Sequence, residues 1–370
     1  MITKLGSVIT EYSVRNKLDE DIPVYSVTNE QGFCTGYFSK DVASKDRTTY
    51  KIVPRGYFAY NPSRINVGSV DWQDCQDRVI VSPLYVVFGV DEKLDQQYLL
   101  HYLKSDITLT YIKALATGSV RDNLKFSILQ EFPINLRPIE EQRKIASILD
   151  RIDRVIALRK EELETLDNLV KSRFIELFGD PECNPHGWPC KLLGQLVVVE
   201  PQNGMYKPQT DYVQDGSGIP ILRIDAFYNG KVTNFRKLKR LNCTETEKQR
   251  YLLQEHDIVI NRVNSIEYLG KCAHICDMVE DTVFESNMMR FHLDESVMDA
   301  VYATHLLCSQ YVYKQILRKA KKAVNQASIN QGDVMSFELL VPPLSIQKQF
   351  TTFIEQTDKS KLCGEMEVAA

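Results

Sequence analysis

The stretch LRPIEEQRKIASILDRIDRVIALRKEELETLDNLVKSRFIELFG, residues 136–179, decides the organisation of this chain. It contains no glycine and no proline between Ile139 and Phe178, and its apolar residues recur at the spacing of one helix face. Pro138 is compatible with a first helical turn, and Gly179 with Asp180-Pro181 is a strong stop signal. The stretch therefore predicts a single helix, on the order of 60 Å long at about 1.5 Å per residue.

The predicted helix carries an apolar stripe that needs a partner, because an isolated helix of this length is rarely stable in water. Charged residues of both signs fill its other faces, as on a solvated coiled-coil surface. We therefore expect the stripe to pair with a second helix further along the chain. The residues assigned to this helical spacer are Gln142, Ile145, Leu149, Ile152, Ile156, Leu163 and Leu166 in the first helix and Gln347, Phe350 and Ile354 in the second.

The chain repeats itself at a domain-sized interval. FPINLRPIEEQRKIASILDRID at 132–153 aligns with FELLVPPLSIQKQFTTFIEQTD at 337–358 at a constant offset of 205, which pairs Gln142 with Gln347. Upstream, YLLHYLKS at 98–105 matches YATHLLCS at 302–309. Two copies at this spacing indicate two globular domains rather than a solenoid of short repeats. The predicted order is a first domain at 1–137, a long helix at 138–180, a second domain at 181–342 and a second helix at 343–370.

Both domains have the pattern of mixed α and β structure. Runs rich in β-branched and aromatic residues, bounded by Gly and Pro, predict strands. They lie at 24–27, 50–53, 57–60 and 79–87 in the first domain, and at 196–199, 220–224, 258–262 and 288–291 in the second. Helical runs lie at 96–116 and 300–320. The predicted fold class is α+β, with two domains in tandem, each followed by a helix, and the two helices pairing as an antiparallel spacer.

Composition favours an intracellular globular protein. The nine cysteines form no CxxC pair, which indicates a reducing, cytoplasmic setting, and Cys272-Ala-His274-Ile-Cys276 lacks the second pair that a zinc site needs. We expect no metal site. The first residues lack the apolar core of a signal peptide, and the longest apolar run, 79–90, is too short and too broken to span a bilayer.

The net charge of −4 is unevenly distributed. Residues 231–250 carry seven basic residues against two glutamates, and residues 310–325 carry five basic residues and no acid. Basic clusters bind phosphate, whereas Arg, Asn and Gln side chains read the edges of guanine and adenine. The same composition also occurs on solvated helix faces and in loops without function. The candidate DNA contacts are Arg262, at the end of the strand-like run 258–262, and eight residues in or near the polar loops after the two helical runs: Arg121, Asn123, Lys125, Lys319, Lys321, Lys322, Asn325 and Gln326.

The two joints between domain and helix resemble those of a known family. PIEEQRKI at 138–145 and PPLSIQKQ at 342–349 are similar to the Pro-Pro-Leu-x-Glu-Gln-x-x-Ile joint of type I restriction–modification specificity subunits. The first copy has Arg137-Pro138 in place of the double proline, and the second has Ile346 in place of the glutamate. The resemblance covers essentially the whole chain.

The resemblance implies a division of labour. Each domain would be a target recognition domain for one half of a split, asymmetric sequence in double-stranded DNA, and the helices would set the spacing. The helices would also dock two methyltransferase subunits, which bind S-adenosylmethionine, and restriction subunits would bring ATP and magnesium. The chain itself would bind no cofactor and catalyse no reaction; it has neither a GxxxxGK[ST] phosphate loop nor an Asn/Asp-Pro-Pro-Tyr/Phe motif.

Two alternatives stay open on the sequence. The acidic net charge favours a scaffold or adaptor whose two domains bind proteins rather than DNA. The second helix is predicted to be short, since only 26 residues follow Leu344, and this favours a truncated, inactive specificity subunit.

Overall fold

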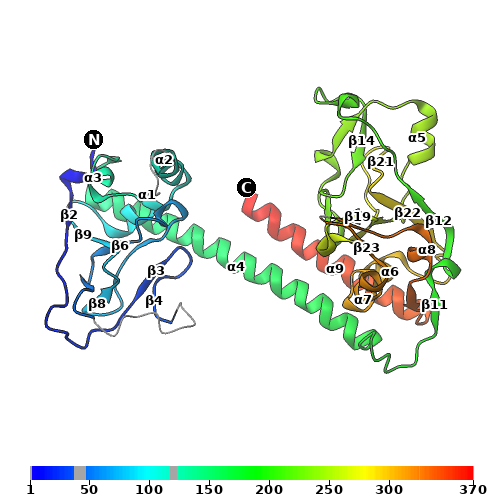
Figure 1. Ribbon diagram of the computed structural model, residues 1–370, viewed down its shortest axis with the longest axis horizontal. Coiled ribbons are helices and arrows are strands. Elements are labelled where there is room, and N and C mark those ends of the chain that lie inside the picture. Colours follow the sequence, from blue (N-terminus) through cyan, green and yellow to red (C-terminus); the bar gives the residue numbers. More distant parts are fainter. Residues whose placement is uncertain (1, 37–46, 117–122, 325, 370) are drawn as a thin grey trace. The chain divides into compact units, whose positions relative to one another are not determined.

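The computed structural model describes residues 2–36, 47–116, 123–324 and 326–369, except for the side chains of Ala116 and of residues after Lys361. The chain divides into two compact units, Met1–Leu158 and Arg159–Ala370. Helix α4, Ile139–Phe178, begins in the first unit and ends in the second (Figure 1). It ends where the sequence predicts, because Gly179 adopts a φ of 75° and its N–H bonds to the carbonyl of Ile175 at 2.8 Å.

The first unit is built on a four-stranded antiparallel sheet, in the order β2-β9-β6-β7. Its strands are β2 Ile9–Glu11, β9 Val86–Val90, β6 Phe58–Tyr60 and β7 Val70–Trp72. Two-stranded pairs join β1 Ile2–Lys4 to β10 Pro133–Asn135, β3 Ser26–Thr28 to β4 Gly32–Cys34, and β5 Lys51–Pro54 to β8 Arg78–Val81. The helices are α1 Gln96–Lys104, α2 Asp106–Ala116 and α3 Phe126–Leu129, with short 3-10 turns at Leu5–Ser7 and Ile65–Val67.

The second unit has a larger, six-stranded sheet in the order β12-β22-β18-β20-β16-β15. Its strands are β12 Val197–Asn203, β22 Met288–Leu293, β18 Ile258–Asn261, β20 Cys272–His274, β16 Gly230–Val232 and β15 Phe227–Tyr228. A four-stranded sheet contains β13 Tyr212–Val213, β17 Lys239–Leu241, β14 Ile219–Leu222 and β21 Val283–Phe284. The helices of its globular part are α5 Glu245–Tyr251, α6 Ala300–Leu307, α7 Gln310–Lys319 and α8 Gln331–Met335.

The structure corrects three of the predicted elements. The run at 79–87 is not one strand but two, β8 and β9, separated by a turn around Pro83. The runs at 96–116 and 300–320 are each two helices, broken at Ser105 and near Ser309. Both serine hydroxyls accept a hydrogen bond from a backbone N–H three residues later, in Thr108 and in Val312. Serine is a good N-cap, so each one begins a new helix.

A buried glutamine joins α4 to the first globular domain. The Gln142 side chain lies in the first turn of α4 and is fully buried. Its Oε1 accepts the backbone N–H of Asp95 at 2.9 Å, and its Nε2 donates to the carbonyls of Lys93 and Arg137, both at 2.8 Å. Asp95 in turn caps α1 by accepting the N–H of Tyr98. One side chain therefore fixes the start of α1 against the start of α4.

The second unit repeats this arrangement at the matched positions. Gln347 is fully buried in the first turn of α9, Leu344–Ala369. Its Oε1 accepts the N–H of Asp299 at 2.8 Å, and its Nε2 donates to Val297 and Pro342 at 3.1 and 2.7 Å. Asp299 caps α6 as Asp95 caps α1. We call these two sets of hydrogen bonds the glutamine clamps.

The strands next to the clamps also correspond. The antiparallel pair β1–β10 has its counterpart in β11 Cys190–Leu192 with β25 Glu338–Leu340. The hydroxyl of Tyr98 donates to the carbonyl of Asn135 at 3.1 Å, and that of Tyr302 donates to Leu340 at the same distance. The two units thus share a frame at the joint, although their sheets differ in strand number and order.

Inside the second unit, α9 runs antiparallel to the C-terminal part of α4 (Figure 1). The ring of Phe350 packs edge-on against that of Phe178, with centroids 5.6 Å apart, and Lys361 forms an ion pair with Asp167. Moving forward along α9 therefore means moving backward along α4. The rings of Phe174 and Tyr302 complete an aromatic cluster with Phe178 and Phe350 in the core.

The predicted spacer residues divide by position. Phe350 and Ile354 are buried, and Leu163, Leu166, Ile145 and Leu149 are half-buried. In contrast, Ile152 and Ile156 are 49% and 38% exposed, and every residue from 150 to 158 is exposed. Within the described residues, the apolar stripe is covered towards both ends of α4 and open in the middle.

Replacement of Gln347 by Ala should destabilise the second unit by about 1–3 kcal/mol, because it leaves buried backbone groups of Asp299, Val297 and Pro342 without partners. Chemical denaturation would measure the change. Gln349→Ala, at an exposed position in the same turn, is the matched control and should change the free energy of unfolding little. Equal stability of the two variants would contradict the structural role of the clamp.

The second unit should lose stability as the pH falls below 6.5. Burial lowers the pKa of His305 to about 4, from an ordinary value of 6.5. Its ring packs edge-on against that of Phe350, with ring centroids 5.1 Å apart. In this pH range the unfolded chain binds a proton that the folded chain does not, so acid favours unfolding. His305→Gln should reduce the stability lost between pH 7 and pH 5 by about 2 kcal/mol at most. Urea denaturation at both pH values measures this, with His186→Gln at an exposed position as the control.

Candidate nucleic-acid interface

A basic hairpin follows helix α7 in the second unit. Strand β23, Lys321–Lys322, pairs with β24, Ala327–Ser328, and the N–H of Ala323 bonds to the carbonyl of Gln326 across the turn at 2.7 Å. Lys321, Lys322 and Gln326 are exposed. The returning strand is anchored, because Ala327 and the following Ile329 are buried in the main core. The hairpin is therefore a polar projection on a fixed base.

Arg262 is brought to the same small sheet. Strand β19, Val263–Asn264, pairs with β24, which gives a three-stranded sheet in the order β19-β24-β23. The carbonyl of Arg262 accepts the N–H of Ile329 at 3.0 Å, and its guanidinium donates to the carbonyl of Ser286 at 3.2 Å. Strand pairing thus brings Arg262 to the small sheet that carries or adjoins four further predicted DNA contacts, Lys319, Lys321, Lys322 and Gln326.

Four cations lie at the hairpin or in the helical turn before it. Arg318 and Lys319 occupy the last turn of α7, next to Lys321 and Lys322. Among the described residues, no carboxylate lies within ion-pair distance of any of these four. Lysines on an edge strand such as β23 also discourage strand pairing between molecules, which is a structural explanation for two of them. It does not account for the cations on α7.

Three of the seven basic residues in the stretch at 231–250 are paired with carboxylates. Arg240 pairs with Glu280 and Lys248 with Asp281, both at 2.7 Å, and Lys231 pairs with Asp358. These hydrogen bonds raise the pKa of Arg240 and of Lys248. The two basic clusters look alike in the sequence, and among the described residues the second has one ion pair, between Lys314 and Glu182, against three in the first.

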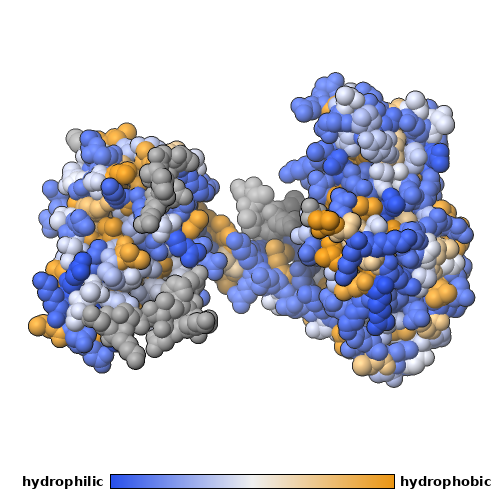
Figure 2. Space-filling model, in the orientation of Figure 1, coloured by the Kyte–Doolittle hydropathy of each residue, from blue (hydrophilic) through white to orange (hydrophobic). Residues whose placement is uncertain are grey.

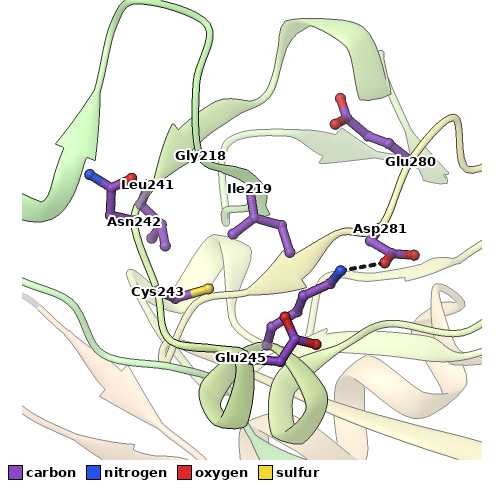
Figure 3. Close-up of a pocket in the computed structure, with 9 residues that line it drawn as sticks. Gly218, Ile219, Leu241, Asn242, Cys243, Glu245, Glu280 and Asp281 are labelled. Carbon is purple, nitrogen blue, oxygen red and sulfur yellow. Dashed lines mark ion pairs between the residues drawn. The ribbon is translucent and has the colours of Figure 1, made fainter.

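A cavity of about 450 Å³ lies beside the ion pairs of Arg240 and Lys248 (Figure 3). It is lined by residues of β14, β17, α5 and the segment before β21. Lys248 forms an ion pair with Asp281 there, and Glu245 and Glu280 line the same cavity. With its lysine paired and three carboxylates on its walls, the cavity is poorly suited to bind a phosphate.

In the first unit the predicted contacts lie before α3. Asn123 and Lys125 are exposed, on either side of the buried Leu124. The N–H of Leu124 bonds to the carbonyl of Pro62 at 3.0 Å, and its carbonyl accepts the hydroxyl of Tyr60 at 3.1 Å. The loop is therefore held by its middle residue while its neighbours face solvent. Arg121 in this unit and Asn325 in the hairpin lie outside the described residues.

The gathered residues have the chemistry of a DNA-reading surface. A two-stranded ribbon fits the major groove, exposed lysines can contact phosphates, and an amide such as that of Gln326 can pair with adenine. On the face shown in Figure 2, hydrophilic residues cover most of the second unit. Sequence reasoning did not select Arg318 as a site residue, although its place beside Lys319 in the acid-free run was a usable signal.

Two further features bear on the class of protein. No group of three or more His, Cys, Asp or Glu side chains in the described part of the chain is placed to hold a metal ion. His274, in the Cys272–Cys276 segment, contacts another histidine: its Nε2 lies 3.0 Å from Nδ1 of His256. No helix in the same part of the chain is both long and apolar enough to cross a lipid bilayer.

Comparison with known proteins gives the same two-part organisation. The family model described as the type I restriction modification DNA specificity domain matches the chain twice, at residues 8–168 and 185–363. The specificity subunits of the type I restriction enzymes EcoKI from Escherichia coli K12 and StySPI from Salmonella potsdam are each 25% identical to this chain. Those matches cover 70% and 71% of this chain, but only 58% of either relative.

Two solved structures have a similar fold. The S subunit of a type I restriction–modification system from M. genitalium matches all of this chain and 92% of its own, with a TM-score of 0.60 and 14% identity. A chain from a structural study of complex assembly and conformational transition in a type I R-M system matches with a TM-score of 0.54, 17% identity and coverage of 100% and 93%. Because the family model matches most of its length, this chain belongs to the family of type I restriction–modification specificity subunits.

Proposed function

We propose that the chain reads an asymmetric, bipartite target in double-stranded DNA on behalf of a type I restriction–modification complex. Each globular domain would bind one half of the target, and the α4 and α9 helices would set the distance between the halves. The observation that carries this proposal is the pair of glutamine clamps. Each clamp joins a helix to a globular domain, and the two domains have different sheets. This is expected if two DNA-binding domains of different specificity are attached to their helices in the same way.

DNA contact is assigned to the hairpin in the second unit and to the Asn123–Lys125 loop in the first. Arg318, Lys319, Lys321 and Lys322, which have no carboxylate within ion-pair distance in the described part of the chain, would contact phosphates, and Gln326 would lie near base edges. The two loops occupy corresponding positions, since each follows the second helix of a matched pair, α1–α2 or α6–α7, and precedes a short helix, α3 or α8.

The open middle of α4 supports a docking role. Five apolar residues there are 38–58% exposed: Ile148, Ile152, Val155, Ile156 and Leu158. An exposed apolar stripe on a helix suits a partner helix. We assign it to the methyltransferase subunits, two per complex, with restriction subunits joining them. S-adenosylmethionine, ATP and magnesium would bind to those partners in the cytoplasm, and this chain would catalyse no step itself.

An adaptor that binds only proteins remains the second candidate, favoured by the net charge of −4. Binding to duplex DNA separates the two functions, because phosphate contacts make affinity fall steeply with salt concentration. The measurement uses the chain assembled with its methyltransferase subunits. Binding without salt dependence, or no binding to duplex DNA by an intact complex, would favour the adaptor.

Replacement of Lys321 and Lys322 together by Ala should weaken DNA binding and reduce the slope of log affinity against log salt by about 2, since each phosphate that is no longer neutralised lowers the slope by about 0.9. The control is Arg236→Ala with Lys237→Ala, which removes two exposed charges from the same unit outside the hairpin. Fluorescence anisotropy at several salt concentrations measures both slopes. An equal change in the two double variants would contradict a specific role for the hairpin.

Lengthening α4 in its exposed middle should change the spacing of the target and leave the two half-sites unchanged. Duplication of residues 151–154 adds four residues, about 6 Å of helix, which corresponds to about two base pairs of DNA. Sequencing that detects methylated adenines would report the spacing. Arg151→Ala with Arg154→Ala changes the same segment without lengthening it and should keep the original spacing. An unchanged spacing after the insertion would contradict the proposed role of the helix.

A further inference from the structure

Two cysteines of the second unit lie in contact. Cys272 begins strand β20 and is fully buried, whereas Cys308 directly follows helix α6 and is exposed. Their Sγ atoms are 3.3 Å apart, within the range of a thiol hydrogen bond. They are separated by 36 positions in the sequence, so the contact is made by the fold rather than by local geometry.

The two sulfurs are not equivalent. The hydrogen bond from Cys272 lowers the pKa of the Cys308 thiol, and the same contact together with complete burial raises the pKa of Cys272 well above its usual value. Cys308 is therefore the sulfur that more readily becomes a thiolate. Since the thiolate is the nucleophilic form, Cys308 is the reactive member of the pair.

Cys308 also has access to solutes. It lines a cavity of about 850 Å³ in the second unit, between the C-terminal part of α4, α9 and the loop before β16. Three lysines, Lys171, Lys231 and Lys361, lie on the walls. A small neutral oxidant that enters this cavity would meet Cys308 first, while Cys272 stays behind it in the core.

We propose that Cys308 and Cys272 form a peroxide-reactive thiol pair, in which Cys308 is the attacking residue and Cys272 the resolving residue. The arrangement has the parts of a redox-sensitive site: an accessible nucleophilic sulfur and a second thiol in contact with it. The other exposed cysteines, Cys75, Cys183 and Cys190, have no second thiol within contact distance among the described residues.

The reaction balances with one hydrogen peroxide. The Cys308 thiolate attacks a peroxide oxygen, the S–O bond forms, the O–O bond breaks, and the departing hydroxide takes up a proton to become water. Cys272 then gives up its proton and attacks the sulfur of the resulting sulfenic acid. The S–S bond forms, the S–O bond breaks, and the second oxygen leaves as water. Two thiols are oxidised by two electrons in total, and one peroxide becomes two waters.

The product would be a covalent link between the central sheet and the end of α6. A disulfide has sulfurs about 2.0 Å apart, so the two atoms must approach by a little over 1 Å. Cys308 can supply this movement, because it lies just beyond the last residue of its helix. The link would be close to α9, since His305 in the preceding turn packs on Phe350.

The test is peroxide oxidation of the full reduced chain, followed by acid quenching, alkylation in denaturant and peptide mass spectrometry. The expected product is a peptide pair joining Cys272 to Cys308, lighter by two hydrogens than the reduced peptides, as the dominant disulfide at low peroxide. Cys308→Ser should abolish this link and leave Cys272 reduced. Cys272→Ser should leave a sulfenic acid on Cys308 that dimedone traps.

Cys75→Ser is the matched control, at an exposed cysteine without a thiol neighbour among the described residues, and should form the 272–308 link as the unaltered chain does. Urea denaturation identifies a variant that fails to fold. In that case the disulfide found by mass spectrometry in the unaltered chain decides whether the proposal holds. The proposal is overturned if the unaltered chain keeps both thiols reduced while Cys75 is oxidised, or if Cys308 pairs with other cysteines as often as with Cys272.

Discussion

The two buried glutamine clamps are the constraint on which the rest of the structure depends. Each glutamine satisfies one backbone N–H and two carbonyls at the point where a globular domain meets its helix. Buried polar groups of this kind cost free energy when they lose a partner, so the direction of each helix relative to its own domain is closely fixed. Everything beyond the joint, including the different sheets, can vary without disturbing it. Under the proposed function, the joints would hold the two DNA-contacting loops in defined positions without contacting DNA bases themselves.

Much of this frame is predictable from the sequence because it occurs twice. The offset of 205 residues singles out Gln142 and Gln347, and the absence of Gly and Pro over forty residues predicts α4. Other features have weaker local signals. Ser105 and Ser309 divide helices whose apolar pattern continues across the break, because capping competes with helix continuation. The small sheet β19-β24-β23 consists of two-residue strands, which are too short for a periodic pattern to show.

The candidate site was predictable in its residue types but not in its grouping. Lys321, Lys322 and Gln326 belong to one loop in the sequence, whereas Arg262 joins them only through strand pairing. Charge counting gives the stretches at 231–250 and 310–325 the same net charge of +5, although carboxylates from distant segments pair with three of the seven basic residues in the first. The acidic net charge is therefore compatible with a local cationic surface. What matters for phosphate binding is which cations lack a carboxylate neighbour, and this depends on tertiary structure.

The central claim is that each domain reads one half of a split DNA sequence. The most direct test maps methylated adenines in cells that express the chain with its methyltransferase subunits, before and after replacement of hairpin residues 323–326. We expect a single asymmetric motif in two parts with a fixed gap, and a change confined to one part when the hairpin is altered. A continuous motif, a change in both parts, or methylation that does not depend on this chain would contradict the account.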